Sequence, residues 1–196
     1  WFGIHGPNVM GAVTGPFMTK MMAQNLELYQ AGEGITASGV FYTAGSKYSI
    51  IANPFASGWF GPTGSGITMG LIIAIMLFSK RDDFKAIAKL SIPCGIFNIN
   101  EPIIFGIPMV MNAMFAVPFF LTPVACVCCG YLVQYLGLCP LFVIDVPWTT
   151  PIGLFGFLAS SGNIMGAIWQ VVIILGVSTL IYTPFVIASN RQTEEA

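Results

Sequence analysis

Residues 97–106 read FNINEPIIFG, and this stretch places one carboxylate and two carboxamides within a long apolar region. Pro102 directly follows Glu101, and proline interrupts helices because it has no backbone donor. We therefore expect Glu101 at membrane depth, where an ionisable side chain is costly and marks a functional site by default. The alternative is a carboxylate that only pairs with another group inside a helix bundle.

The composition is that of a membrane protein. Apolar residues make up 56% of the 196 residues and charged residues only 8%, against roughly 25% charged in an ordinary soluble domain. The formal net charge of −1 favours neither nucleic acid as a partner nor a polybasic attachment to a membrane surface. The sequence opens at Trp1 without an initiator methionine or a signal peptide, so we expect it to be a fragment.

Two stretches, residues 113–137 and 164–188, carry no charge and are long enough to cross a membrane as helices. Residues 66–79 form a third candidate, which reaches the necessary length with residues 61–65. Four basic residues follow within residues 80–89, and the positive-inside rule places this loop in the cytoplasm. Two spans then return the chain to the same side, where Arg191 lies in a polar tail.

Two further apolar stretches are broken by proline and glycine. Residues 91–112 contain three prolines, and residues 141–161 contain two. Non-helical backbone at membrane depth is tolerated only where it is buried in protein or lines a watery cavity. A pair of interrupted segments also points to the binding site of a transporter. The sequence thus predicts an all-α membrane protein with two re-entrant hairpins that face each other. Residues 2–22 are expected in a span, and residues 24–60 in interfacial helices and loops.

Several other residues could contact a polar ligand. His5 and Gly6 lie in GIHGPN, where an imidazole can donate or accept near neutral pH and glycine permits close approach. A lone histidine can equally be structural. The glycine-containing loop at residues 61–66 could present backbone amides to a ligand, or could simply start a helix.

Residues 146–151 read VPWTTP and offer an aromatic face beside two hydroxyl groups. The indole of Trp148 suits a sugar ring, although an interfacial tryptophan belt is the alternative. Asp145 precedes this motif, and we place it at the water boundary. Carboxylate, amides, histidine and aromatic ring together fit a neutral polyhydroxylated ligand. Metal binding would need more convergent His, Asp or Glu side chains, so we expect neither a metal nor a cofactor.

These motifs resemble those of a known family. FNINEPIIFGIP at residues 97–108, with GIHG upstream and PWTTP downstream, is similar to the membrane subunit, enzyme IIC, of the bacterial sugar phosphotransferase system. The likeness is to the lactose/cellobiose/diacetylchitobiose branch and covers the C-terminal half of such a subunit. It implies that residues 1–188 are part of an enzyme IIC-like transport domain and residues 189–196 a cytoplasmic tail. The N-terminal half, which in the family forms the dimer interface, would be absent.

The resemblance also implies a function. Such subunits are multi-pass homodimers of the bacterial inner membrane that carry a β-linked disaccharide, which a phosphocysteine on a separate enzyme IIB then phosphorylates. His5 and Glu101 would hold the hydroxyl that becomes phosphorylated, and Glu101 could help to remove its proton. The candidate substrate contacts are Asn98, Asn100, Trp148, Thr149 and Gly6.

Two other classes of protein stay open. A cation-coupled secondary sugar transporter would use Glu101 and His5 to handle protons. A receptor or scaffold would bind sugar without moving it. The family usually has a Gly-Gly-Ser-Gly loop where this chain reads GPTGSG at residues 61–66.

Overall fold

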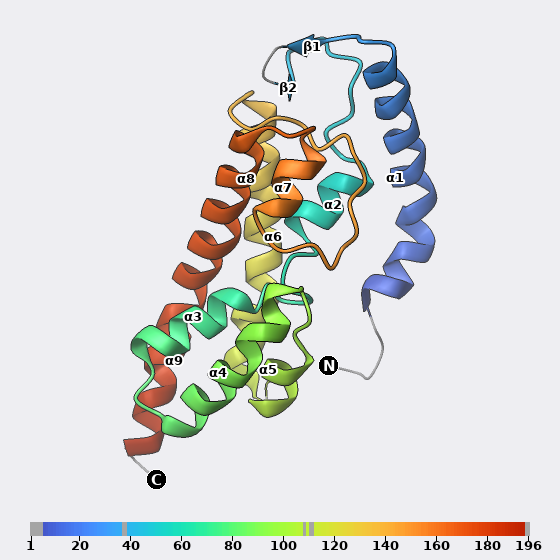
Figure 1. Ribbon diagram of the computed structural model, residues 1–196. Helices are drawn as coiled ribbons and strands as arrows, with labels where there is room; N and C mark the ends of the chain where they lie inside the picture. Colours follow the sequence, from blue (N-terminus) through green and yellow to red (C-terminus); the bar gives the residue numbers. More distant parts are fainter. Residues whose placement is uncertain (1–5, 37–38, 108, 110–111, 195–196) are drawn as a thin grey trace.

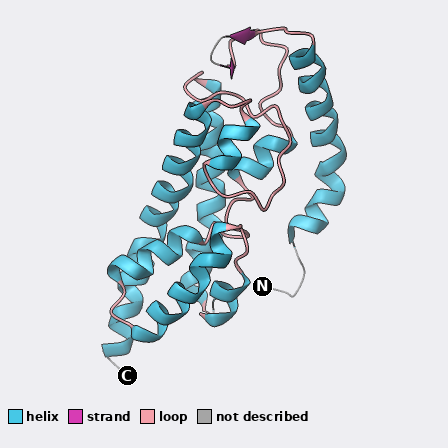
Figure 2. Ribbon diagram, viewed as in Figure 1, coloured by secondary structure: helices cyan, strands magenta, loops and turns pink. Residues whose placement is uncertain are grey.

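The computed structural model describes residues 6–36, 39–107, 109 and 112–194, and these are mostly helical (Figure 1 and Figure 2). The helices are α1 Gly6–Gln30, α2 Asn53–Trp59, α3 Met69–Phe78, α4 Asp82–Ile96, α5 Glu101–Gly106, α6 Ala113–Tyr135, α7 Leu154–Ala159, α8 Ile164–Val171 and α9 Ser178–Glu194. A π-helical turn, η2 Val172–Val177, joins α8 to α9. The strands β1 Ile35–Thr36 and β2 Gly39–Val40 pair antiparallel, with Ile35 opposite Val40.

Two helices within the described residues are long and apolar enough to cross a membrane. They are Ala113–Tyr135, with a mean hydropathy of 2.0, and Ile164–Asn190, with a mean hydropathy of 2.3. The second runs without a break through α8, η2 and most of α9, so the turn at η2 widens the helix and does not end it. Both predicted spans are confirmed as helices, and α9 continues past residue 189 to Glu194.

Helix α9 packs against α3 and α6 at the lower end of the molecule in Figure 1. Gly70 in α3 lies so close to Ser178 that a Cβ atom there would overlap its side chain and backbone. Small residues at such contacts let the backbones of membrane helices approach each other closely. The buried residues around this contact form the lower core, which includes Leu71, Ile75, Phe115 and Tyr182.

A second cluster, the upper core, surrounds Trp59 of α2. Its indole stacks on Phe142 with the ring centroids 5.3 Å apart, and Phe142 meets Phe155 edge-on at 6.1 Å. Gly130 of α6 leaves room for the indole, because a Cβ atom there would overlap it. The loop at residues 61–68 leads from α2 in the upper core to α3 in the lower core.

The third predicted span is wrong in one part. Only Met69–Phe78 is helical, whereas residues 61–68 form a series of turns. Thr63, Gly64, Gly66 and Ile67 all have positive φ values, between 51° and 85°. This left-handed backbone conformation is not compatible with a right-handed helix. The loop is therefore not helical, and α3 begins only at Met69.

The two predicted interruptions are present. Helix α4 ends at Ile96, and a non-helical tip at residues 97–100 separates it from α5. Residues 140–153 contain no helix before α7 begins. Whether these segments are re-entrant in a membrane stays a prediction. In residues 24–60 the structure places the end of α1, the β-hairpin and α2.

The turn at residues 79–81 is tied to the end of α9. Asn190 accepts from the backbone N–H of Lys80 at 2.9 Å and donates to the carbonyl of Phe78 at 3.0 Å. Arg81 donates to both carboxylate oxygens of Asp83, at 3.1 and 2.6 Å, and this hydrogen bonding lowers the pKa of that carboxyl group. The predicted loop at residues 80–89 is wrong in extent: α4 begins at Asp82, with Asp82 and Asp83 in its first turn, where acidic side chains favour a helix start. The basic residues 80–89 and the end of α9 therefore share one end of the molecule (Figure 1).

Candidate functional site

Three loops far apart in the sequence meet at the side chain of Asn98. Its Oδ1 accepts from the backbone N–H of Thr63 at 2.7 Å. Its Nδ2 donates to the carbonyl oxygens of Trp148 at 2.5 Å and Thr150 at 2.9 Å. One carboxamide thus joins the loop at residues 61–68, the tip between α4 and α5, and the segment that carries Trp148.

The backbone at Asn98 suits this role. Its φ is +65°, a left-handed conformation that asparagine adopts more readily than most other residues. Only 5% of the residue is exposed. A buried amide must find hydrogen-bond partners, because leaving it unpaired costs free energy. Asn98 finds its partners in non-helical backbone, whose N–H and carbonyl groups would otherwise lack hydrogen bonds.

Asn100 makes a parallel contact two residues later. Its Nδ2 donates to the carbonyl of Ser65 at 2.7 Å, and its exposed fraction is 7%. Gly64, with φ +73°, lies directly against the carboxamide, and a Cβ atom there would overlap it. Asn100 also precedes the first residue of α5, so its fixed position determines where that helix begins.

The loop at residues 61–68 is held from other directions too. Tyr182 of α9 donates to the carbonyl of Gly66 at 2.7 Å. Thr63 accepts at its Oγ1 from Met69 N–H at 3.2 Å. Thr63 and Ile67 are β-branched residues with positive φ, which is rare and costs free energy. Such strain persists only where surrounding contacts over-determine the backbone, and it clusters at functional sites.

The predicted ligand-binding side chains next to Asn98 and Asn100 are exposed. Glu101 is the first residue of α5, and its side chain faces outward. Trp148 is 63% exposed, and Thr149 beside it is exposed as well. Thr150 N–H donates to the carbonyl of Pro147 at 2.9 Å, which closes a turn around the two. A fixed backbone therefore presents a carboxylate on one segment, and an indole and a hydroxyl on the other.

The structure does not bring every predicted residue together. Asn98 and Asn100 are hydrogen-bonded to backbone groups of other segments. Asn98 also connects the segments that carry Glu101 and Trp148. His5 lies outside the described residues, and Gly6 is the first residue of α1. Whether any of these residues contacts a sugar stays a prediction.

Sequence reasoning missed Gln170 of α8, which is fully buried. Its Oε1 accepts from the N–H groups of Gly153 at 2.9 Å and Gly156 at 2.8 Å, and its Nε2 donates to the carbonyl of Gly58 at 3.1 Å. It thereby fixes the start of α7 beside α2. A carboxamide in an otherwise apolar helix, close in sequence to an interrupted segment, is the signal that could have identified it.

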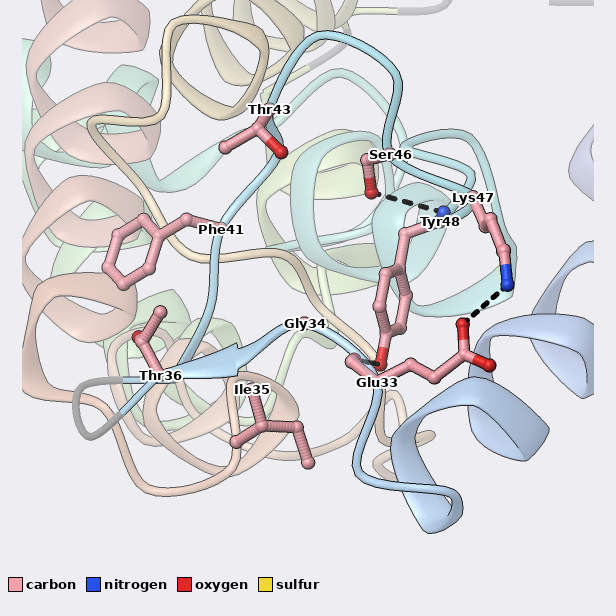
Figure 3. A pocket seen from close by; sticks show the side chains of 9 residues that line it. All are labelled: Glu33, Gly34, Ile35, Thr36, Phe41, Thr43, Ser46, Lys47 and Tyr48. Atoms are coloured by element: carbon pink, nitrogen blue, oxygen red, sulfur yellow. Dashed lines mark hydrogen bonds and ion pairs between the residues drawn. The ribbon is translucent and has the colours of Figure 1, made fainter.

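A hollow of about 420 Å³ lies elsewhere, beside the β-hairpin. Figure 3 shows Glu33 and Lys47 reaching toward each other there, with Nζ and Oε2 2.8 Å apart. The hydroxyl of Tyr48 donates to the carbonyl of Glu33 at 2.7 Å, and Tyr48 N–H donates to Ser46 Oγ at 3.2 Å. Its polar groups thus largely satisfy one another, and none of the predicted site residues lines it.

Comparison with known proteins gives consistent results. Residues 1–123 match the family model of the phosphotransferase system, EIIC. The chain is 38% identical over 205 residues to a PTS system cellobiose-specific EIIC component of Lactococcus lactis, covering 99% of this chain and 41% of that protein. It is 37% identical over 184 residues to a lichenan permease IIC component of Bacillus subtilis, covering 93% of this chain and 38% of that protein.

A solved structure agrees in fold. It is that of the transporter ChbC, the IIC component of an N,N'-diacetylchitobiose-specific phosphotransferase system, with a TM-score of 0.84 and 35% identity. The match covers 98% of this chain and 42% of that one. The chain therefore spans about two fifths of the length of the proteins it matches, at 41%, 38% and 42%.

Proposed function

This chain belongs to the EIIC family of the phosphotransferase system, and we propose that it is the sugar-binding part of a membrane permease. Members of this family are integral membrane proteins, and the family implies a sugar substrate and a partner EIIB domain. The ligand that we propose is a β-linked disaccharide. Relatives named for cellobiose and lichenan, and a structural match named for N,N'-diacetylchitobiose, support this class of substrate.

The observation that carries the proposal is the junction at Asn98. Its three hydrogen bonds connect the segment bearing Glu101 to the segment bearing Trp148, and both of these side chains are exposed. An indole supplies a flat apolar face for a sugar ring. An ionised carboxylate accepts hydrogen bonds from hydroxyl groups. These two groups suit the two surfaces of a pyranose, its apolar face and its hydroxylated edge.

We assign the roles as follows. Glu101, with His5, holds the hydroxyl that is to be phosphorylated, while Trp148 stacks on a sugar ring. Asn100, Thr149 and the backbone at Gly6 make further contacts. In the transfer step the sugar oxygen bonds to phosphorus as the S–P bond of the EIIB phosphocysteine breaks, and the hydroxyl proton passes to Glu101. Orientation of the attacking hydroxyl is a large part of phosphoryl transfer.

Membership of this family also supports a proposal for the wider assembly. We propose a homodimer in the bacterial plasma membrane, with the basic residues 80–89 and the end of α9 in the cytoplasm. Phosphorylated EIIB would then reach the sugar from that side. Equilibrium binding to the detergent-solubilised permease tests the substrate class: cellobiose, lactose and diacetylchitobiose should compete with one another, and the α-linked disaccharide maltose should compete poorly. Equal competition by maltose would contradict a β-specific site.

We expect Trp148→Ala to weaken binding of the disaccharide, and Trp148→Phe to retain much of it. A ring face supplies the contact, and stacking is worth about 1 kcal/mol beyond area burial, or roughly fivefold in Kd. Isothermal titration calorimetry measures both values. Leu154→Ala serves as a control, because Leu154 is also exposed but lies on α7. Equal affinity of the wild type and Trp148→Ala would leave Trp148 as an interfacial residue only.

We expect the basic residues 80–89 and the C-terminal end of the chain to be labelled from the same, cytoplasmic side. Single cysteines at Asp83 and Thr193, in a background without the native cysteines, should react with a membrane-impermeant maleimide only in inside-out vesicles. Asp83 is exposed in the first turn of α4, within the basic residues 80–89, which have a surplus of lysine and arginine. Labelling of the two positions from opposite sides would refute the topology.

A further inference from the structure

The hydrogen-bonding capacity of Asn98 is almost exhausted by the protein itself. A carboxamide has two N–H donors and an oxygen with two lone pairs. Both donors are used, on the carbonyls of Trp148 and Thr150, and the oxygen already accepts from Thr63 N–H. With 5% of the residue exposed, little of it is left for a ligand to touch. A sugar could reach at most one remaining lone pair.

The same bonds determine where the indole of Trp148 projects. Trp148 is 63% exposed, so packing against the protein does little to hold it. Its position depends on the backbone of the turn, and Asn98 holds that backbone by hydrogen bonds to the carbonyls of Trp148 and Thr150. The turn is closed by Thr150 N–H donating to the carbonyl of Pro147 at 2.9 Å. Loss of Asn98 would free this turn to move.

We propose that Asn98 is a positioning residue that sets Trp148 relative to Glu101, and that it acts on sugar binding through Trp148 rather than as a ligand. This inference rests on the proposed function. It changes the role expected for Asn98 from the sequence, where it was a candidate substrate contact. Because Asn98 lies on the tip between α4 and α5, three residues before Glu101, its amide links the segment of the carboxylate to the segment of the aromatic ring.

Asn100 provides the matched control. It is also a buried asparagine on the tip, but its side chain bonds to the carbonyl of Ser65, in the loop at residues 61–68. No hydrogen bond in the described residues joins its side chain to the turn around Trp148. Replacing Asn100 with alanine should therefore weaken binding by a route that does not pass through Trp148.

A double-mutant cycle on sugar affinity separates the two roles. Two variants of Asn98 guard against a folding defect. Asn98→Asp keeps the shape but replaces the donating Nδ2 with an oxygen that faces the two carbonyls, and Asn98→Gly keeps the left-handed backbone without strain. Each should weaken disaccharide binding by up to about fivefold, as Trp148→Ala does. In the Trp148→Ala background, each should have an effect of less than about twofold, while Asn100→Ala should keep its full effect.

Hydrogen–deuterium exchange on the sugar-free permease supplies a second readout. In Asn98→Gly the backbone amides of Thr63 and Thr150 should both exchange faster than in the wild type. In Asn100→Ala only the loop at residues 61–68 should do so. If the permease binds no disaccharide at all, the proposed function fails and this measurement alone decides the inference. Additive effects of Asn98 and Trp148 on Kd, or unchanged exchange at Thr150, would overturn it.

Discussion

Glu101→Gln should leave the permease folded and inserted, impair sugar binding, and nearly abolish formation of sugar phosphate. Glutamine keeps the shape of the side chain but removes its charge and its basicity. An amide offers one acceptor oxygen and two N–H donors, whereas the ionised carboxylate only accepts. Glu101 is the first residue of α5, and its side chain is exposed. The substitution therefore should not disturb buried packing.

The expected size of this effect comes from the step that Glu101 would assist. General-base assistance is typically worth about 10²–10⁴-fold in rate. The measurement is the initial rate of sugar-phosphate formation with phosphorylated EIIB, at equal amounts of inserted permease. Glu27→Gln, an exposed glutamate on α1, serves as the control for loss of a charge. Asn100→Ala should be milder, because the carboxylate remains. A wild-type rate for Glu101→Gln would leave the carboxylate with a structural role only.

Gly64→Ala should strongly destabilise the site. Gly64 has φ +73°, which glycine adopts freely and alanine does not. A Cβ atom would also overlap the carboxamide of Asn100, so the tip, and with it the start of α5 at Glu101, would have to move. Overpacking costs about 1–3 kcal/mol, in addition to about 1–2 kcal/mol for the left-handed backbone.

Gly32→Ala separates these two contributions. Gly32 has nearly the same φ, +75°, but a Cβ atom there would meet nothing within 4 Å. Thermal unfolding in detergent should therefore show a larger fall in Tm for Gly64→Ala than for Gly32→Ala, and only the former should lose sugar affinity. Equal losses in Tm for the two variants would mean that the contact with Asn100 contributes nothing.

Much of the helical framework could be predicted from hydropathy. The spans at residues 113–137 and 164–188 are long and uncharged, and the structure has a continuous helix in each. The breaks near Pro102 and before α7 could also be predicted, because proline removes a backbone donor. The loop at residues 61–68 could not, because Thr63 and Ile67 are held in left-handed conformations by tertiary contacts that no local pattern encodes.

The candidate site could be predicted in part. The carboxylate of Glu101 and the indole of Trp148 indicated a polar ligand, and the structure places the two residues on segments that the side chain of Asn98 joins. The partners of Asn98 and Gln170 could not be predicted, because their bonds reach backbone groups between 14 and 112 residues away. In a membrane protein such carboxamides replace the hydrogen bonds that broken helices lose. Residue type alone does not separate this role from ligand binding.

The central claim is that this chain delivers a β-linked disaccharide to a phosphorylated partner. Its most direct test is uptake of radiolabelled cellobiose into vesicles that contain the full-length permease, with and without phosphorylated EIIB inside. We predict that label accumulates as sugar phosphate, that accumulation needs phosphorylated EIIB, and that Glu101→Gln removes it. Accumulation of unmodified sugar driven by a proton gradient would instead show a cation-coupled transporter, and binding without uptake would show a receptor. Either result would contradict the account.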